Sequence, residues 1–525
     1  MEDTEQVEQI GEKIVEQISD TAASLPDVQA SQTSFSLSGI DQFLSDNFDP
    51  IAKKVESIVF YEFDLFPGMF EETVKIKLIL IWLVLAGLFF TFSMRFMNVC
   101  YFSHAFNILR GKYDTDGNDG EINRFQALAT SLSGTVGLGN IAGVAIAVSA
   151  GGPGAVVWMI VMGFFSMMTK FTEVMLGVKY RKQYEYKGVV HYSGGPMYYL
   201  RAIFANRNIP FVGQFMAGLF AVLCILGMIG AGPLFQTNQA YQQFVLVTGG
   251  DESFLADKGW LFGLVMAGLV GIVIIGGIKS IASAASKIVP LMGIVYMAAA
   301  FIVIAIHFHN IPTAFTEIFK GAFNLKAGLG AFLGVMLVGV QRATFSNEAG
   351  FGTAAIAHSS VKTDDPVTQG FVGMLGPFID TVLVCTTTAL VIVISGEYLN
   401  GAPAQGFAEG VELTSRAFQS GISWFPYVLT LTVFLFAYST MLAWSYYGEK
   451  AFTFLVGDNK YTTLIYKIFL LFFIVVGAAA SLSSVVAFTD SMVFAMTIPN
   501  LIGLYLVSGE VRRDVKEYLQ KLKSA

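Results

Sequence analysis

Polar residues and glycines interrupt a long apolar run at residues 130–150, TSLSGTVGLGNIAGVAIAVSA. The run is long enough to cross a bilayer, since about 20 mostly apolar residues suffice. Its centre contains Ser133, Gly134, Thr135, Gly137, Gly139 and Asn140. Glycines disfavour a continuous helix, and backbone groups freed at mid-membrane are tolerated where they line a cavity or bind something. The pattern therefore indicates a binding site in an interrupted span. The alternative is that these small residues pack one helix closely against another.

The backbone N–H and carbonyl groups that the break frees can bind negatively and positively charged groups, respectively. N–H groups at the start of an outer half-helix, around Leu138, Gly139 and Asn140, would lie at the positive end of its dipole and suit a carboxylate. Carbonyls freed at residues 133–136, including those of Thr135 and Val136, suit an ammonium group or a cation. This break therefore offers backbone groups that suit either sign of charge.

A second apolar run, residues 328–357, is interrupted in the same way by the sequence FSNEAGFG at residues 345–352. Carbonyls freed between Phe345 and Ala349, with Asn347 among them, again suit an ammonium group and a cation. Two such interruptions are less expected from random glycine usage than one. They favour a site where two broken helices face each other.

The composition predicts an all-α integral membrane protein. Of the 525 residues, 54% are hydrophobic and 14% charged, and the mean hydropathy is +0.61. Three widely separated cysteines provide neither a disulfide framework nor paired metal ligands. The sequence holds no HExxH, no GxSxG and no Cys/His cluster, so a membrane-embedded enzyme is disfavoured, and we expect no cofactor and no nucleic-acid partner.

The chain divides into three parts. Residues 1–75 form an acidic tail, in which Val7, Ile10, Ile14 and Ile18 recur at helical spacing. The sequence does not indicate a protein partner for this tail. Residues 76–510 form the transmembrane domain, and residues 509–525 form a basic tail. Eleven apolar runs fall near 76–96, 125–150, 153–178, 212–247, 260–277, 289–308, 328–357, 369–395, 424–447, 462–481 and 483–508.

Lysine and arginine alternate between the connecting segments. The basic segments follow the odd-numbered runs and end with Arg512, Arg513, Lys516, Lys521 and Lys523, whereas the intervening segments are acidic or neutral. Because cytoplasmic loops carry the excess of basic residues, this alternation predicts an outside N-terminus and a cytoplasmic C-terminus. We expect the plasma membrane of a bacterium or an archaeon.

The two broken runs each begin a group of five. With the run at 76–96 set aside as an extra span, the first repeat covers about 122–308 and the second about 328–508. An odd number of spans in each half inverts one half relative to the other. This 5+5 inverted repeat is the plan of many secondary transporters, whereas a channel would need repeated pore-lining polar residues.

Several motifs carry a specific resemblance. TVGLGN resembles the unwound first helix of the neurotransmitter-type sodium symporters and of the bacterial leucine transporter. A closer resemblance is to the alanine or glycine:cation symporter family of the amino acid-polyamine-cation superfamily. It is carried in order by NIAGVA (140–145), GGPGAVVWM (151–159), GGPMYY (194–199), QTN (236–238), GGIKSI (276–281), FSNEAGFG (345–352), AYST to WSYYGEK (437–450) and IPNLIGL (498–504).

This resemblance implies further site residues. Gln236 would reach the substrate, Ala349 and Gly350 would line it, and Trp444 would close it. Sodium would bind the hydroxyls of Ser439 and Thr440 together with the carbonyls of Ser133 and Val136. The alternative for the two hydroxyls is bonding to a carbonyl in the preceding turn of their own helix.

The implied function is sodium-coupled symport of a small neutral amino acid of the alanine or glycine class by alternating access. A proton-coupled carrier on the same fold is the alternative, with Glu348 or Asp380 carrying the proton unless it caps a helix or pairs with Arg342. Lys170 and Glu173, three residues apart, would form a mutual pair. The expected partners are the amino acid, sodium and the lipid bilayer.

Three positions depart from the family pattern. Leu138 replaces a common threonine, Val338 replaces a common tryptophan, and Gly232-Pro233 replaces Gly-Asn. The loss of a tryptophan opens space near the second break. We therefore expect a pocket that admits side chains larger than alanine, such as glutamine; competition assays that find only glycine and alanine recognised would contradict this.

Overall fold

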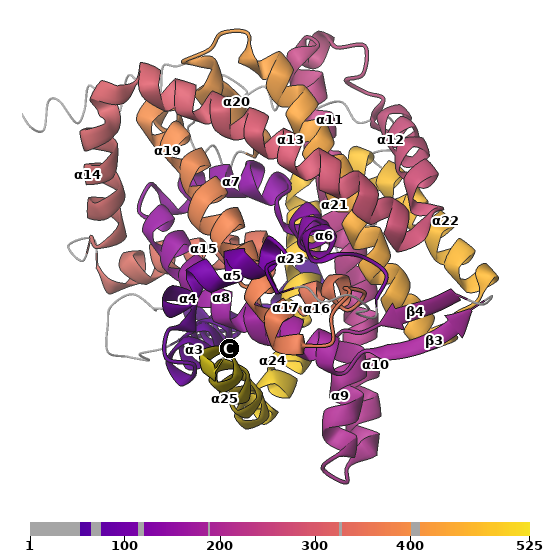
Figure 1. Ribbon diagram of the computed structural model, residues 1–525. Coiled ribbons are helices and arrows are strands. Elements are labelled where there is room, and N and C mark those ends of the chain that lie inside the picture. Colours follow the sequence, from indigo (N-terminus) through magenta and orange to yellow (C-terminus); the bar gives the residue numbers. More distant parts are fainter. Residues whose placement is uncertain are drawn as a thin grey trace, which may run out of the picture.

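The protein is a helical bundle in a computed structural model that describes residues 53–64, 75–113, 120–186, 189–324, 328–400 and 410–524. Figure 1 shows long helices crossing the molecule, with the short strand pair β3 (Lys182–Tyr186) and β4 (Val189–Ser193) at the lower right. The predicted helix at Val7–Ile18 lies outside the described residues. The all-α prediction is confirmed for the part of the chain that is described.

The described chain contains eight helices that are long and apolar enough to span a membrane, and a bent pair that makes a ninth. These are α8 (Ala155–Lys179), α10 to α11 (Pro210–Val247), α13 (Gly277–Ile306), α15 (Leu329–Asn347), α17 to α19 (Pro366–Ser395), α21 (Phe425–Val456), α22 (Lys460–Ala479) and α23 to α24 (Leu482–Leu506). Two shorter apolar helices, α3 (Leu78–Ser93) and α12 (Gly259–Ile274), lie where two further spans are expected. The count of eleven and the 5+5 arrangement stay predictions.

The first predicted break is confirmed. Helix α6 (Arg124–Thr135) ends at the break, a 3₁₀ turn η1 (Leu138–Asn140) follows, and α7 (Ala142–Gly151) continues at an angle of 56°. A capping box starts α6, in which Asn123 and Gln126 each bond the other's backbone N–H. The sequence therefore specifies both the beginning and the end of this half-helix.

The second break is confirmed as well. Helix α15 ends at Asn347, and the short α16 (Thr353–His358) begins six residues later. Glu348, Gly350 and Gly352 between them all have positive φ, of 55°, 95° and 81°. Glycine adopts this conformation without a steric penalty, whereas Glu348 does so as a side-chain-bearing residue. Helix α15 packs on α7 and α8, and α16 packs on α6 and α8.

Two spans that we expected to be continuous contain π-helical segments. One is η2 (Gly230–Leu234) between α10 (Pro210–Ile229) and α11 (Phe235–Val247). The other is η6 (Phe378–Cys385), between the pair α17 (Pro366–Gly373) and α18 (Leu375–Pro377) and helix α19 (Thr386–Ser395). Pro233 and Pro377 stand inside or directly before these segments, where a missing N–H favours the irregularity. Such π segments often accompany functional sites.

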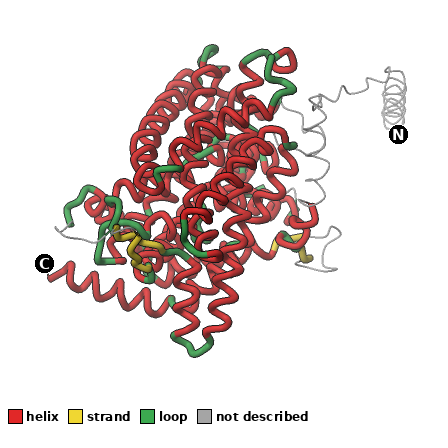
Figure 2. Tube along the Cα trace, turned by 90° about the vertical axis from the view of Figure 1, so that its right-hand side faces the viewer, coloured by secondary structure: helices red, strands yellow, loops and turns green. Residues whose placement is uncertain are grey.

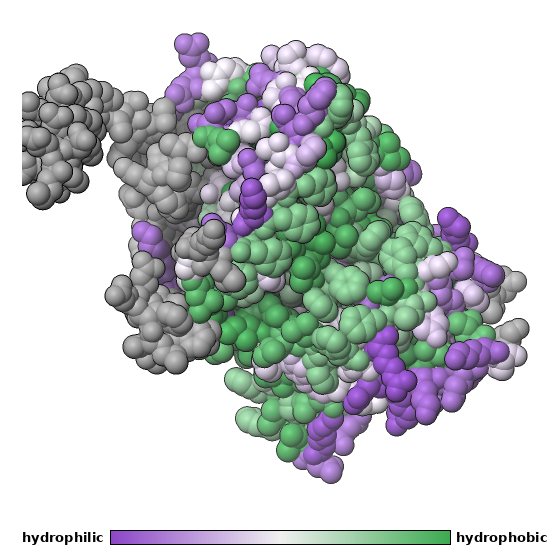
Figure 3. All heavy atoms as spheres, turned by 90° about the vertical axis from the view of Figure 1, so that its left-hand side faces the viewer, coloured by the Kyte–Doolittle hydropathy of each residue, from purple (hydrophilic) through white to green (hydrophobic). Residues whose placement is uncertain are grey.

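The middle of the outer surface of the bundle is apolar. In Figure 3, hydrophobic side chains gather over the middle of one face, and hydrophilic ones gather toward the top and the lower right. Large apolar side chains are exposed on several helices, among them Ile272, Ile294 and Phe472. A bilayer is the solvent that suits such a surface.

Smaller elements cover the end of the bundle at which α6 begins. These are the antiparallel strands β3 (Lys182–Tyr186) and β4 (Val189–Ser193), the helices α4 (Met97–Cys100), α5 (Phe102–Leu109) and α9 (Pro196–Ala205), and the C-terminal helix α25 (Ser508–Ser524). In the view of Figure 1, α14 (Ile311–Ala322) runs along the left side and α20 (Val411–Gln419) lies near the top. The other strand pair, β1 (Glu62–Asp64) and β2 (Lys75–Lys77), precedes α3.

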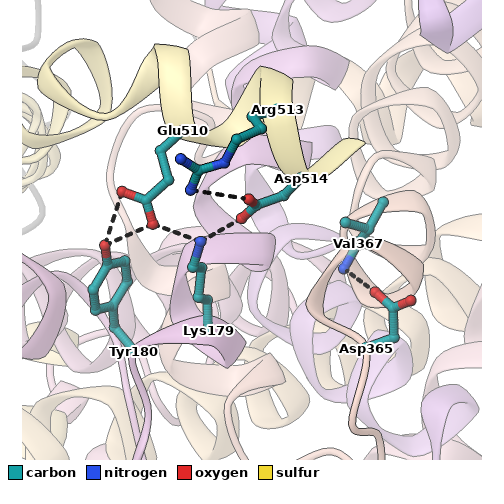
Figure 4. Close-up of polar contacts among 7 residues, drawn as sticks. All are labelled: Lys179, Tyr180, Asp365, Val367, Glu510, Arg513 and Asp514. Atoms are coloured by element: carbon teal, nitrogen blue, oxygen red, sulfur yellow. Dashed lines mark hydrogen bonds and ion pairs between the residues drawn. The ribbon is translucent and has the colours of Figure 1, made fainter. Parts of the chain in front are cut away.

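The predicted basic C-terminal tail forms α25, which runs along the edge of the molecule (Figure 2). Lys179, at the end of α8, forms ion pairs with both Glu510 and Asp514 of this helix (Figure 4). Tyr180 donates a hydrogen bond to Glu510 at 2.9 Å, and Val511 is buried. Helix α25 is therefore docked through its acidic residues, although the tail as a whole is basic.

Candidate functional site

The two breaks lie against each other. A Cβ atom at Gly139 would lie 3.6 Å from both the ring of Phe345 and the Cα of Ser346, so the 3₁₀ turn η1 packs on the end of α15. Phe345 also packs edge-on against Phe235, with ring centroids 5.6 Å apart. The structure thus brings together the two segments that the sequence singled out for binding.

Gln236 reaches the first break. Its side-chain oxygen accepts a hydrogen bond from the N–H of Leu138 at 3.2 Å, and its amide group donates to the carbonyl of Ala231 at 3.0 Å. Asn140 accepts from the N–H of Gly137 at 2.9 Å. Two N–H groups of the break are therefore held by side-chain oxygens, which defines the backbone geometry around Leu138.

Trp444 lies against the end of α6. Its indole N–H donates to the carbonyl of Gly134 at 3.0 Å. A Cβ atom at Gly232 would lie 3.3 Å from that of Trp444, so a glycine here lets the π segment η2 approach the indole closely. The predicted residues Trp444, Gln236 and Leu138 thus surround the same break.

Some of the last backbone carbonyls of α6 accept hydrogen bonds, and others do not. Those of Leu132, Gly134 and Thr135 accept hydrogen bonds from Val136, Trp444 and Gly137, respectively. Within the described chain no hydrogen bond reaches the carbonyls of Ser133 and Val136, the two that the sequence assigned to a cation. Free carbonyls at a helix end need a partner.

The hydroxyl groups of Thr440 and Ser439 differ in their hydrogen bonding. The hydroxyl of Thr440 is buried, finds no hydrogen-bond partner among the described residues, and lies directly beside the α-carbon of Gly137. The hydroxyl of Ser439 donates to the carbonyl of Phe436 at 3.1 Å, which is the bonding within its own helix that we named as the alternative. Of these two hydroxyls, that of Thr440 has no hydrogen-bond partner in the described chain, whereas that of Ser439 donates its hydrogen and keeps its oxygen lone pairs; Ser133 donates to the Ser439 carbonyl at 2.6 Å.

A second group of polar side chains surrounds Asp380 in η6. Its carboxylate accepts hydrogen bonds from Asn140 at 2.5 Å, from Ser346 at 2.9 Å and from Thr381 at 2.8 Å. Carboxylate, hydroxyl and amide oxygens are the ligands that hard cations prefer. No cluster of three or more His, Cys, Asp or Glu side chains that could hold a metal ion occurs in the described ranges.

Sequence reasoning did not assign Asp380 to the cation site. The available signal was an aspartate inside an apolar span, three residues after Pro377. The alternative of an Arg342 partner for Asp380 or Glu348 is wrong, because Arg342 forms its ion pair with Asp490 of α23 (Leu482–Ala495). Glu348 instead accepts from the hydroxyl of Thr353 at the start of α16.

The predicted pair of Lys170 and Glu173 is also wrong. Lys170 donates to the carbonyl of Asn347 at 2.9 Å. One carboxylate oxygen of Glu173 accepts from the N–H groups of Gly350 at 2.9 Å and Gly352 at 3.0 Å. The broken helix leaves buried backbone groups whose desolvation must be compensated, and the two charged side chains serve that purpose instead of pairing with each other.

The residues of the second break point in different directions, and Gly350 does not point toward the first break as predicted. Asn347 donates to Thr381 at 3.1 Å and accepts from the N–H of Ala349 at 3.0 Å, so it lies close to Asp380. The carbonyl of Gly350, however, accepts from Asn500 at 2.8 Å, and a Cβ atom at Gly350 would meet Leu83 of α3 at 2.7 Å. The structure therefore places Gly350 against α3 and α24 (Thr497–Leu506), and not toward η1.

A model of the sodium:alanine symporter family matches residues 64–525. The chain belongs to the sodium:alanine symporter family. Members of this family are transporters and not enzymes, so this chain is a membrane transporter.

Curated relatives agree with this assignment. The chain is 39% identical over 440 residues to the sodium/alanine symporter AgcS of Methanococcus maripaludis, covering 84% of this chain and 93% of AgcS. It is 32% identical to the probable sodium/glutamine symporter GlnT of Bacillus subtilis, covering 87% and 91%. It is 31% identical to the putative sodium/proton-dependent alanine carrier protein YrbD of Bacillus subtilis, covering 84% and 90%.

The fold is similar to that of a solved transporter. The crystal structure of MhsT in complex with L-phenylalanine matches with a TM-score of 0.50 at 15% identity, over 74% of this chain and 89% of MhsT. At this identity the likeness concerns the fold alone. It agrees with the leucine-transporter fold that the resemblance implied.

Proposed function

We propose that this symporter couples the inward movement of sodium to the uptake of a small neutral amino acid of the alanine or glycine class, by alternating access. The observation that carries the proposal is the group of free oxygens at the first break: the hydroxyl of Thr440 and the carbonyls of Ser133 and Val136. They suit a monovalent hard cation in a chain whose family is named for sodium and alanine.

The amino acid is proposed to bind between the two breaks. Its carboxylate would meet the backbone N–H groups at Leu138, Gly139 and Asn140, with Gln236 exchanging its present bond to Leu138 for one to the substrate. Thr135, Asn347 and Ala349 would contribute from the ends of the half-helices, and Trp444 would close the site. Because the Gly350 amide is held by Glu173, Gly350 supports the break and does not contact the substrate in this proposal.

Sodium is proposed to bind at two places. One is beside Thr440, and the other is at the Asp380 carboxylate with the hydroxyls of Ser346 and Thr381. An ion that prefers one conformation of the site makes substrate affinity depend on sodium, and substrate affects sodium binding by the same factor. Each positive charge that crosses a potential of 100 mV adds about 2.3 kcal/mol to the driving force.

Proton coupling is the second candidate. One oxygen of the buried Glu348 carboxylate has no partner in the described chain, and the relative YrbD bears the name of a putative sodium/proton-dependent carrier. Glutamine is the second candidate substrate, since GlnT is named a probable sodium/glutamine symporter. We further propose a plasma-membrane location with the N-terminus outside and helix α25 in the cytoplasm, on the basis of the alternating basic segments.

The test is transport by the purified full-length chain in proteoliposomes. Labelled alanine, glycine and glutamine are supplied with an inward sodium gradient, or with an equal potassium or proton gradient. Saturable accumulation that only sodium drives supports the proposal. Accumulation that only the proton gradient drives would move the coupling role to Glu348, and flux without saturation would indicate a channel.

A further inference from the structure

A groove of about 290 Å³ opens on the outer surface of the bundle between α6, α13 and η6. The described residues that line it are all apolar, glycine or proline. Phe125, Ile294 and Leu383 at its rim are 46%, 69% and 42% exposed, so the groove continues the apolar surface that a bilayer suits. We call it the α6–α13–η6 groove.

The sequence of α13 explains why the groove is open. Pro290 and Gly293 stand in the middle of this helix and line the groove, and Gly293 has no side chain to fill it. A Cβ atom added at Gly293 would meet no atom of another element within 4 Å. The space beside Gly293 is therefore large enough for a further hydrocarbon group.

The facing wall belongs to the first half-helix. Leu128, Leu132 and Val136 recur every four residues along α6 and its C-terminal cap, so they form one stripe that lines the groove. Gly134 lies on the opposite side of α6, where its α-carbon is close to the indole of Trp444. Helix α6 is thus held by α21 on one side and borders the groove on the other.

The lining selects a hydrocarbon ligand. A polar solute would lose its hydrogen bonds to water in the groove and would find no polar side chain there. A groove that stays empty deprives its wall residues of packing contacts. An acyl chain from the surrounding bilayer restores these contacts without burying a polar group.

The length of the groove matches one leaflet of a bilayer. Val289 and Met297 mark its extent along α13, and eight residues of helix cover about 12 Å. The hydrocarbon part of one leaflet is about 15 Å thick, which is half of a core of about 30 Å. A chain that runs along α13 therefore fills the groove within its own leaflet.

A basic side chain stands at the end of the groove where a lipid headgroup would lie. Lys287 is exposed and precedes Val289 by two residues. It is seven residues from Ile294, so both side chains lie on the same face of α13. A lysine at the end of an apolar run extends its ammonium group to the level of the lipid phosphates.

We propose that the α6–α13–η6 groove binds one acyl chain of a phospholipid whose phosphate lies beside Lys287. The chain packs along Leu132 and Val136, on the side of α6 that faces away from Trp444. The lipid is therefore a packing partner of the half-helix that ends at the first break.

Photocrosslinking in vesicles tests the proposal. The purified full-length chain is reconstituted in phosphatidylethanolamine and phosphatidylglycerol, with a trace of phosphatidylglycerol that carries a diazirine in one acyl chain, and labelled peptides are identified by mass spectrometry. Gly293→Leu and Ala129→Leu fill the groove from two walls. Gly268→Leu is the matched control, because a Cβ atom at the exposed Gly268 of α12 also meets no atom of another element within 4 Å.

We expect the groove segments 125–136 and 289–297 to be labelled about fivefold more per residue than α12, since a chain in the groove buries more methylene groups than one on an open surface. This holds for the wild type and for Gly268→Leu. Each groove-filling variant should lower groove labelling to the level of α12, whose unchanged labelling reports that the variant is folded and inserted. Equal labelling of the groove and α12 in the wild type, or groove labelling that survives both substitutions, would overturn the proposal.

Lys287→Gln tests the position of the headgroup. Removal of this charge should lower groove labelling by the phosphatidylglycerol probe about fivefold. Unchanged labelling would overturn the placement of the phosphate at Lys287. The measurement requires no transport, so its result does not depend on the proposed function.

Discussion

The side-chain amide of Asn140 donates to the carboxylate of Asp380, at 2.5 Å, and also to the backbone carbonyl of Asp380, at 3.1 Å. Asn140 belongs to the first break, and Asp380 to the π segment η6 of another span. Because Asn140 also holds the N–H of Gly137, any ion that binds Asp380 acts on the backbone of the first break. This contact is the physical link between the ion and the substrate in the proposed mechanism.

Replacement of Asp380 by asparagine tests this link. The variant keeps the size of the side chain and removes its charge, so we expect the sodium concentration for half-maximal alanine uptake to rise about tenfold, which corresponds to ~1.4 kcal/mol. Asp365→Asn is the matched control, because Asp365 caps α17 and asparagine caps a helix equally well. A lower maximal rate with unchanged sodium dependence would argue against an ion at Asp380.

The two neighbouring hydroxyls on α21 give a second prediction. Thr440→Ala removes an unpartnered hydroxyl beside the first break, so sodium-dependent uptake should fall at least tenfold, while Thr440→Ser should retain it. Ser439→Ala removes a hydroxyl that bonds within its own helix and should leave uptake within about twofold of the wild type. Equal losses in both alanine variants would show that Ser439 also serves the ion.

Glu173 accepts hydrogen bonds from the second break, and substitutions can distinguish this structural role from a role in carrying a proton. Glu173→Ala leaves the N–H groups of Gly350 and Gly352 without an acceptor, and the Asn500 amide keeps only its bond to the Gly350 carbonyl. Each buried unpaired donor costs about 1–3 kcal/mol, so thermal unfolding in detergent should begin at a clearly lower temperature. Glu173→Gln retains an acceptor oxygen and should unfold closer to the wild type; a proton-carrying role would instead abolish uptake in this variant without loss of stability.

Docking of helix α25 should depend on pH. Partial burial alone would raise the pKa of Glu510, but hydrogen bonds from Lys179 and Tyr180 and the charge of Lys179 outweigh it, so the pKa lies below its ordinary value of 4.5. A carboxyl group with a depressed pKa in the docked state stabilises that state above its ordinary pKa and loses this contribution as the pH falls through the depressed value. We therefore expect α25 to be protected from hydrogen exchange near pH 7 and to lose protection below about pH 4.5.

The control for this prediction is Lys179→Met, which removes the partner of Glu510 and Asp514. Residues 508–524 should then exchange faster at pH 7 and respond less to acid. Protection that does not change between pH 7 and pH 4 in the wild type would mean that the buried Val511 and Val515, and not the ion pairs, hold the helix.

Much of the architecture could be predicted from local sequence. The two breaks follow from glycines and polar residues inside apolar runs, and both occur where expected. The direction of single side chains could not be predicted in this way. Ser439 and Thr440 are neighbours with similar chemistry, yet in the described chain the hydroxyl of Ser439 donates to the Phe436 carbonyl and that of Thr440 has no hydrogen-bond partner.

Contacts between residues that are far apart in the sequence could not be predicted either. The spacing of Lys170 and Glu173 on one helix favours a mutual pair, and only the packing of α8 against the second break shows that each compensates backbone groups there. Asp380 acquires its role because Asn140 and Ser346, from two other spans, meet it at a π segment. Hydrophobic periodicity does not specify such a segment.

The most direct test of the central claim is the reverse coupling, in which an amino-acid gradient drives sodium. Proteoliposomes with equal sodium on both sides receive external alanine at zero membrane potential, and the influx of radioactive sodium is followed for the wild type, Asp380→Asn and Asp365→Asn. The account predicts alanine-driven sodium influx in the wild type and in Asp365→Asn, with a large loss in Asp380→Asn at the same sodium concentration. Alanine uptake that carries no sodium into the vesicles would contradict the account.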